Sequence, residues 1–333
     1  MHRTLAALAC ATLATAAAHA QVPPPSAETV AGYIAAAEKL AGNDLRALLE
    51  LCKPAPATRP AQALVDKLIA AQIARAAPEP GKAFDNLYFV GGAWASTWAL
   101  VTPQGLILLD AMNNDDEADR LIDKGLRKMG LDPAQIRHVV VSHAHGDHYG
   151  GLAWLAARYQ FGVVMSEIDW RQAEGTLEFN SPHWGPPPKF DASRDRKVQD
   201  GDRLTLGDAT ATFYLTPGHT LGTVTTVFDV RQGERTHRVL LWGGTAFNFG
   251  KNIPRLQSYI DATERMAKLA REQNVEVMIS NHASYDGTMP KLAALARGAS
   301  PNPFVIGNDA VVRGLQAMGE CAKAQRDRFL LEK

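Results

Sequence analysis

Apolar positions at the front of the chain recur with the period of amphipathic helices. Residues Ala27–Glu50 are rich in Ala and Leu at helical spacing, and a second such segment follows at Ala61–Ala77. Prolines at positions 54, 56 and 60 separate the two segments, and Pro78–Gly81 ends the region. No cluster of chemically useful side chains occurs here. We therefore expect a helical extension that packs on the main domain or on a partner subunit.

From Phe84 onward the pattern changes to short β-type runs. Three strands are expected within residues 86–110, divided by Gly91-Gly92 and by a turn at 103–105. A helix is expected at 116–129. The β-branched run Ile136–Ser142, typical of a strand buried on both faces, ends directly before His143. A helix at 150–159 and a strand at 161–166 complete this half.

The second half repeats this order after a Pro-rich loop at Ser181–Asp191. Strands are expected near 203–206, 209–216, 223–230 and 237–242, then a helix at Leu256–Asn274 and a last strand at Val275–Ser280. Strands in two halves, each followed by helices, predict an α/β fold with two sheets face to face and helices outside, a four-layer αββα sandwich. The expected division is a helical extension at 21–81, a main domain at 82–299, and a C-terminal loop and helix at 300–333.

Composition fits a globular protein with a sizeable core, at 46% hydrophobic and 21% charged residues. Lys plus Arg and Asp plus Glu balance at 35 each, so no net charge draws the chain to nucleic acid or to an anionic membrane. We therefore expect a small-molecule substrate, with no nucleic-acid partner.

The first twenty residues are patterned as an export signal. An apolar run at Leu5–Ala18 follows a short polar start, and Ala18-His19-Ala20 supplies the small-x-small motif of a cleavage site. The run is too short for a membrane anchor. We expect a signal peptide at 1–20, cleavage near Ala20, no membrane insertion, and a periplasmic or secreted mature protein. The alternative is a lipoprotein signal with Cys10 as the lipidated residue.

Cleavage would leave two cysteines, Cys52 and Cys321. An even number in an oxidising compartment predicts one disulfide between the front of the mature chain and its tail. The alternative is two unrelated buried thiols. Neither cysteine lies near a His or Asp cluster, so neither is proposed as a metal ligand or nucleophile.

Four candidate metal ligands occupy the segment that follows the buried strand at 136–142. His143 and His145 are two apart, so on an extended segment both project to one side. Gly146 lets the chain turn and direct Asp147 and His148 to a second point nearby. Imidazole nitrogens and a carboxylate suit zinc. The alternatives are a solvated His-rich loop and a single structural ion.

Two further histidines follow strand ends. His219 stands in Thr-Pro-Gly-His-Thr, where Pro and Gly fix a tight turn, and His282 follows the last predicted strand. Ligands delivered from several strand ends converge in one cleft. Five His and one Asp give three ligands for each of two zinc ions, and open coordination positions for water are typical of catalytic zinc.

The pattern H-x-H-x-D-H, then T-P-G-H-T, then a late strand-end His resembles the metallo-β-lactamase fold superfamily over about residues 84–290. This resemblance implies a dizinc hydrolase and assigns its ligands. The first zinc would be held by His143, His145 and His219, and the second by Asp147, His148 and His282.

One further segment narrows the resemblance. Where many members carry a metal-bridging Asp, and β-lactamases of the first subclass carry Gly-Gly-Cys, this chain reads Trp242-Gly243-Gly244-Thr245. The lack of both the Asp and the Cys resembles the third, cysteine-free subclass of metallo-β-lactamases. The run Pro186–Phe190 also resembles a segment of that subclass. The Ser residues that hold the β-lactam carboxylate in that subclass are not evident, and Thr245 and Asn248 occupy the neighbourhood instead.

Other aromatic and polar residues are weaker candidates. Trp94 and Tyr285 are expected to contact substrate along with Thr245 and Asn248, and Asn281 could support the site. A core position is an equally good interpretation of Trp94. His183 lies in the Pro-rich loop and could touch substrate, although a surface role fits it better. His138 and His237 are expected to be ordinary structural histidines.

The sequence predicts an exported dizinc hydrolase that opens a cyclic amide, in the first instance a β-lactam. Asp147 would orient the nucleophile as well as bind metal, and no G-x-S-x-G nucleophile motif is present. The first alternative is a dizinc lactonase or esterase of the same fold. The second is a non-catalytic periplasmic zinc-binding protein. A homo-oligomer formed through the helical extension is a further expectation.

Overall fold

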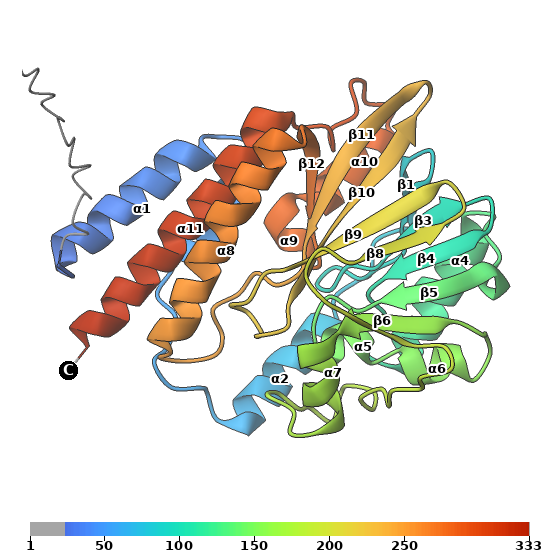
Figure 1. Ribbon diagram of the computed structural model, residues 1–333, viewed down its shortest axis with the longest axis horizontal. Coiled ribbons are helices and arrows are strands. Elements are labelled where there is room, and N and C mark those ends of the chain that lie inside the picture. Colours follow the sequence, from blue (N-terminus) through green and yellow to red (C-terminus); the bar gives the residue numbers. More distant parts are fainter. Residues whose placement is uncertain (1–23, 333) are drawn as a thin grey trace, which may run out of the picture.

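The computed structural model describes residues 24–332 (Figure 1). The predicted signal peptide at 1–20 and the alternative lipidated Cys10 lie outside the described residues. Within residues 24–332, no helix is long and apolar enough to cross a membrane.

Two sheets form the centre of the structure. The first has seven strands in sequence order, antiparallel from β1 to β4 and parallel from β4 to β7. Its strands are β1 (Gly81–Phe84), β2 (Leu87–Phe89), β3 (Trp98–Thr102), β4 (Gly105–Leu109), β5 (Ile136–Val140), β6 (Gly162–Ser166) and β7 (Arg196–Val198).

The second sheet has five strands in the order β12-β11-β10-β9-β8, antiparallel except for the parallel pair β11 and β12. Its strands are β8 (Arg203–Leu206), β9 (Ala209–Leu215), β10 (Val224–Gln232), β11 (Arg235–Trp242) and β12 (Val275–Ser280). Each sheet is therefore built from one half of the strand sequence, as the alternation of strands and helices predicts.

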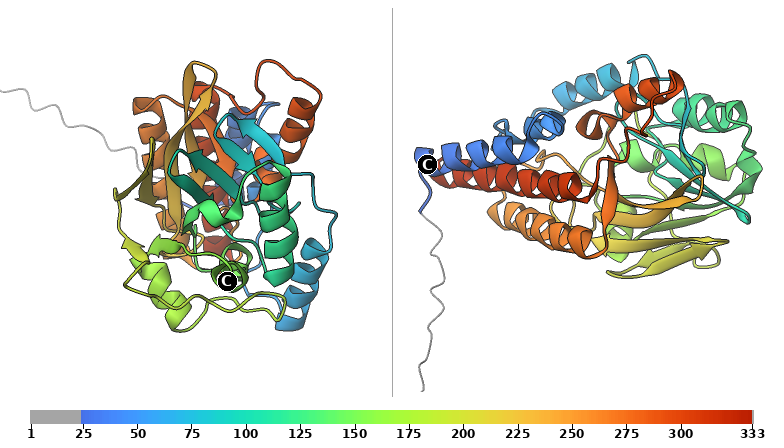
Figure 2. Two further views of the ribbon diagram at one scale, coloured as in Figure 1. Left: turned by 90° about the vertical axis from the view of Figure 1, so that its right-hand side faces the viewer. Right: turned by 90° about the horizontal axis from the view of Figure 1, so that it is seen from above.

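Helices cover both outer faces (Figures 1 and 2). Outside the first sheet lie α3 (Asp115–Glu117), a π-helical turn η2 (Ala118–Asp123), α4 (Lys124–Lys128), a 3-10 turn η3 (Pro133–Gln135), α5 (Gly146–Tyr149), α6 (Leu152–Ala156) and α7 (Glu167–Glu174). Outside the second lie α8 (Ile253–Glu272), α11 (Asn308–Leu331) and α1 (Ala27–Ala41), whereas α9 (Ala283–Asp286) and α10 (Thr288–Ala296) follow the end of β12.

Three apolar clusters separate these layers. Phe89 and Trp98 of the first sheet face Phe213 and Ile279 of the second between the sheets. The outer clusters lie between each sheet and its helices. The four-layer αββα prediction is confirmed.

The front of the chain differs from prediction in one respect. The continuous helical segment expected at 27–50 is wrong, because α1 ends at Ala41 and a 3-10 helix η1 covers Arg46–Cys52. Gly42 stops α1 by adopting φ 55°, a left-handed conformation that glycine adopts readily. The helix α2 (Gln62–Ile73) matches the second predicted segment.

The extension and the C-terminal helix pack together on the second sheet. Ala37 of α1 and Leu48 of η1 are buried in the cluster that also contains Leu315 of α11 and Leu256 of α8. Cys52 and Cys321 form the predicted disulfide, which joins η1 to α11. The extension thus packs on the main domain, one of the two expected outcomes, whereas an oligomer through it stays a prediction, as do the predicted boundaries at 81 and 299.

Several short elements lie beyond the sequence prediction. α7, β7, α9 and α10 form in segments whose apolar pattern is too short to separate them from loops. β7 illustrates the reason, because only Val198 of its three residues is buried.

Candidate metal centre

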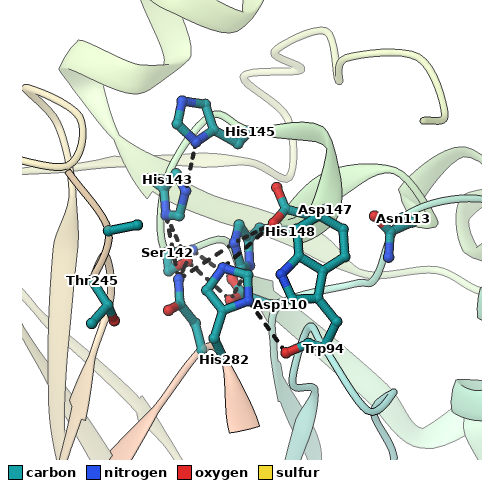
Figure 3. A network of polar contacts seen from close by, with 12 residues as sticks. Trp94, Asp110, Asn113, Ser142, His143, His145, Asp147, His148, Thr245 and His282 are labelled. Atoms are coloured by element: carbon teal, nitrogen blue, oxygen red, sulfur yellow. Dashed lines mark hydrogen bonds and ion pairs between the residues drawn. The ribbon is translucent and has the colours of Figure 1, made fainter. Parts of the chain in front are cut away.

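The H-x-H-x-D-H segment leaves the end of β5 and turns into the short helix α5 (Figure 3). His143 and His145 precede α5, whereas Asp147 and His148 lie within it. Gly146 is required at the turn, because a Cβ there would lie 2.4 Å from the ring of Trp184. The predicted change of direction after Gly146 therefore directs the two pairs of side chains differently.

All six predicted ligands come together from three places in the chain. His143, His145 and His219 form one group whose ligand atoms lie within 4.8 Å of one another, and His143, Asp147 and His148 form another. His219 comes from the loop between β9 and β10, and His282 from the end of β12. The Nε2 atom of His282 lies 3.5 Å from Oδ2 of Asp147, which places it at the second group. All six side chains are buried.

Hydrogen bonds orient the imidazole rings. Nδ1 of His143 lies 2.7 Å from the carbonyl oxygen of Gly243, and Nδ1 of His219 lies 2.7 Å from that of Ala246. A carbonyl only accepts, so each Nδ1 carries the proton and each Nε2 keeps its lone pair for a metal. In His145 the nitrogen that faces the expected metal position is Nδ1, which lies 3.0 Å from Nε2 of His143. Ring orientations of this kind match the requirements of metal-ligating histidines.

Asp110 contacts a predicted ligand and was not predicted from the sequence. It follows β4, and its Oδ2 atom accepts from Nδ1 of His148 at 2.8 Å and from the Ser142 hydroxyl at 2.9 Å. Its Oδ1 atom accepts from the Ser142 backbone N–H at 2.7 Å. Asp110 has φ 66°, an uncommon conformation for a non-glycine residue. A strand ending in Asp was the only signal in the sequence.

Asp169 of α7 joins the two histidine loops and was also missed. Its Oδ2 atom accepts from the Ala144 N–H at 2.9 Å and from the Thr220 hydroxyl at 2.8 Å, and its Oδ1 atom accepts from the Gly222 N–H at 3.1 Å. Because Ala144 lies between His143 and His145, and Thr220 follows His219, this carboxylate fixes the two loops relative to each other.

Arg255 and Glu178 support the same loops from the other side. Nε of Arg255 donates to the Gly218 carbonyl at 2.6 Å, and its guanidinium also donates to the His219 carbonyl and to Glu178. Oε2 of Glu178 lies 3.9 Å from Nε2 of His145. Burial opposes charge on Glu178, but His145 and Arg255 outweigh it and lower the pKa of this carboxyl.

The protonation of the buried histidines differs from one to the next. Burial lowers the pKa of His143 and His219 well below their usual value, which favours the neutral, metal-binding form. Burial likewise lowers the pKa of His282 to about 4. Burial opposes charge on His148 too, but the carboxylates of Asp147 and Asp110 outweigh it and raise its pKa to about 10.

Four of the six predicted ligands, His145, Asp147, His219 and His282, line a cleft of about 320 Å³. Trp94, Asn248 and Tyr285 line this cleft, as their prediction as substrate contacts requires. Trp94 stacks on His282, with ring centroids 5.5 Å apart. Thr245 does not line the cleft: it is buried, and its hydroxyl lies 3.1 Å from that of Ser280, apart from the histidine cluster in Figure 3.

The remaining candidates lie beside the site or away from it. Asn281 donates to the Gly243 carbonyl at 2.6 Å and so supports the loop that holds His143. His183 does not line the cleft, although its neighbour Trp184 does. His237 pairs with Glu276 at 3.0 Å, and His138 lies on β5, away from the predicted ligands.

A model of the metallo-beta-lactamase superfamily matches residues 91–232. Among curated proteins, the chain is similar to hydroxyacylglutathione hydrolase of Rhodopseudomonas palustris, with 34% identity over 116 residues, 35% of this chain and 36% of the relative. It is also similar to the hydroxyacylglutathione hydrolase of Synechocystis, with 32% identity over 38% of this chain and 40% of the relative. The chain thus spans little more than a third of the length of these relatives.

Solved structures match a larger share of this chain than the curated proteins do. The subclass B3 metallo-beta-lactamase of Bradyrhizobium japonicum is 29% identical, with a TM-score of 0.62 over 72% of this chain and 90% of that chain. A metallo-beta-lactamase of Cronobacter sakazakii is 25% identical, with a TM-score of 0.64 over 80% of this chain and 92% of that chain. The chain therefore carries a metallo-beta-lactamase superfamily domain, and its structural neighbours are subclass B3 metallo-beta-lactamases.

Proposed function

We propose that this protein is a dizinc hydrolase that opens a cyclic amide, with a β-lactam as the substrate. The observation that carries the proposal is that five histidines and one aspartate cluster together and that four of these six side chains line an open cleft. A purely structural zinc site would close its coordination with four protein ligands, whereas three ligands for each ion leave positions for water.

The donor set fits zinc. Imidazole nitrogens and a carboxylate oxygen are ordinary zinc ligands, and the protonated Nδ1 atoms of His143 and His219 leave Nε2 free to coordinate. The first zinc would be held by His143, His145 and His219, and the second by Asp147, His148 and His282. Bound there, the two ions would supply a water of lowered pKa and an electrophile for the carbonyl oxygen.

The chain itself would position these groups and the substrate. Oδ2 of Asp147 lies 3.2 Å from Nε2 of His148 and 3.5 Å from Nε2 of His282. These distances support a role in which its carboxylate would orient a nucleophilic water beside the second group. Trp94 holds His282 by stacking and by accepting from its Nδ1 at 3.2 Å. Asn248 and Tyr285 offer polar contacts at the cleft wall.

The residues that follow β11 support a zinc site without a cysteine ligand. Gly243 and Gly244 follow Trp242, and Gly244 packs on His219, where a Cβ would lie 2.6 Å from the His219 Cβ. Thr245 provides neither a carboxylate nor a thiolate. The second zinc would therefore depend on Asp147, His148 and His282 alone, which is the ligand set that the resemblance to the third subclass implies.

A second candidate function is the hydrolysis of a lactone or another ester. β-Lactam antibiotics carry a carboxylate, yet none of the residues that line the described cleft is Lys or Arg. A neutral substrate would need no such partner. The partial likeness to proteins named hydroxyacylglutathione hydrolase, which act on esters of a thiol, points the same way.

Side-by-side turnover of nitrocefin and an N-acyl-homoserine lactone by the zinc-loaded protein tests the proposal. We expect β-lactam turnover that is lost in His148→Ala. Lactone turnover alone would favour the second candidate. Turnover of neither compound, with zinc bound, would leave the third hypothesis, a non-catalytic periplasmic zinc-binding protein.

Export is part of the proposal. The disulfide between Cys52 and Cys321 is compatible with an oxidising compartment such as the periplasm. Cleavage near Ala20 would be tested by N-terminal sequencing of the mature protein, and an unprocessed N-terminus in the cytoplasm would contradict it.

A further inference from the structure

We propose that helix α2 of the N-terminal extension forms a subsite for an uncharged apolar group of the substrate, such as an alkyl chain. The inference rests on the proposed function only in assuming that the cleft beside the six predicted ligands receives substrate. Beyond that function, α2 would select the substrate through apolar contacts.

One face of α2 lines the cleft. Val65, Leu68, Ile69 and Gln72 contribute to its wall, and their spacing of three and four residues places them on one side of the helix. Leu68 is 53% exposed, so a large apolar side chain faces the open cleft without a partner from the rest of the described chain. An apolar substrate group that covers this surface would be stabilised by its removal from water.

The position of α2 is fixed relative to the predicted ligands. Arg59, just before α2, forms an ion pair with Glu178, and its guanidinium lies 4.3 Å from the centre of the Phe179 ring. That ring meets His145 edge-on, with centroids 4.8 Å apart. Gln62 at the start of α2 donates to the Asn180 carbonyl at 2.7 Å. The extension is thus linked to the predicted ligand His145 through Phe179.

The side of the cleft that α2 forms carries no charged side chain. The aromatic side chains of Trp94, Phe179 and Trp184 also line this cleft. The ionisable groups that line the described cleft are three of the predicted histidine ligands, Asp147 and Tyr285, and no Lys or Arg is among them. An anionic group beside α2 would find no cationic side chain, whereas an uncharged alkyl chain would meet the apolar surface of α2 and of these aromatic rings.

The test measures binding without turnover. Isothermal titration calorimetry would compare N-methylbutanamide with N-methyldecanamide, neutral amides with one short and one long chain, on the zinc-loaded and the zinc-free full-length mature protein. We expect each added methylene to tighten binding by up to about fourfold in both forms. Equal affinity for the two amides would overturn the subsite.

Two leucines of the same helix provide a variant and its control. Leu68 lines the cleft, whereas Leu64, with a similar exposure of 49%, does not. Leu68→Ser should weaken binding of the long amide severalfold with little effect on the short one, and Leu64→Ser should change neither. Equal losses in both variants, with circular dichroism confirming that both are folded, would overturn the role of Leu68.

The outcomes separate the subsite from the proposed function. Chain-length dependence without hydrolysis of nitrocefin or lactone would support the subsite and contradict the proposed hydrolase. Hydrolysis of either compound, with no chain-length dependence of amide binding, would support the proposed hydrolase and overturn the subsite. A concentration-dependent dimer that Leu64→Ser and Leu68→Ser weaken equally would show that α2 is an interface between copies, which would overturn the subsite.

Discussion

The Nδ1 atom of His148 lies 2.8 Å from Oδ2 of Asp110, and both side chains are almost fully buried. This contact fixes the His148 ring so that Nε2 faces Asp147. It also crosses 38 residues of sequence and joins the end of β4 to α5. The orientation of a predicted ligand therefore depends on a residue that the ligand motif does not contain.

Asp110→Asn should weaken zinc binding at the second site while leaving the fold intact. Loss of a carboxylate behind a metal-binding histidine reduces metal affinity by about 10- to 100-fold. Competition with a chelator, followed by metal analysis, would measure this. Asp116→Asn is the matched control, because Asp116 is exposed and pairs only with Arg120. Equal affinity in the two variants would contradict the role of Asp110.

Zinc binding should displace at least one proton at pH 7. Asp147 and Asp110 raise the pKa of His148 to about 10, so its ring holds a proton at neutral pH that zinc must remove. The affinity should therefore rise about tenfold per pH unit and level off above pH 10. Burial keeps His143, His219 and His282 neutral, so they release none at pH 7. Calorimetry in two buffers of different ionisation enthalpy counts the protons, and a count of zero would refute this linkage.

Arg255→Ala should destabilise the protein far more than Arg265→Ala on the same helix. Arg255 is buried and Glu178 is nearly so, with side chains 9% and 14% exposed, and the loss of one partner of a buried pair costs about 3–5 kcal/mol. The lower end applies here, because Arg59 also pairs with Glu178. Arg265 and Asp200 are both exposed, and such pairs contribute about 0–1 kcal/mol. Urea denaturation gives both free energies of unfolding, and similar values would be evidence against a buried support.

Removal of the disulfide should lower stability without removing zinc. Cys52 and Cys321 are 269 residues apart, and the loss of a native disulfide costs about 2–5 kcal/mol. The double variant Cys52→Ser, Cys321→Ser should therefore unfold at lower urea concentration and still bind zinc, because neither cysteine lies in the histidine cluster. Loss of zinc in the folded double variant would instead indicate that the extension helps to hold the site.

The sequence predicted those parts of the protein that depend on local pattern. The β-branched run before His143 and the Gly and Pro residues around His219 indicated strand ends and turns, and the structure has strand ends and turns at these positions. The two-sheet order was likewise readable from the alternation of strands and helices.

What the sequence could not predict depends on long-range contacts. Asp169 joins Ala144 to Thr220, and Arg255 reaches Glu178 over 77 residues, and no periodicity indicates either partner. Thr245 was expected at the substrate, but its position after β11 places its hydroxyl against Ser280. The contribution of α2 to the cleft had no sequence signal, because the extension carries no chemically distinctive residue.

The central claim is that six side chains hold two zinc ions, and the stoichiometry of zinc binding tests it most directly. Titration of the metal-free protein with zinc, followed by metal analysis after dialysis, should give two equivalents per chain. His282→Ala should retain one, because His282 belongs to the second group. A single equivalent in the unmodified protein, or an unchanged count in His282→Ala, would contradict the account.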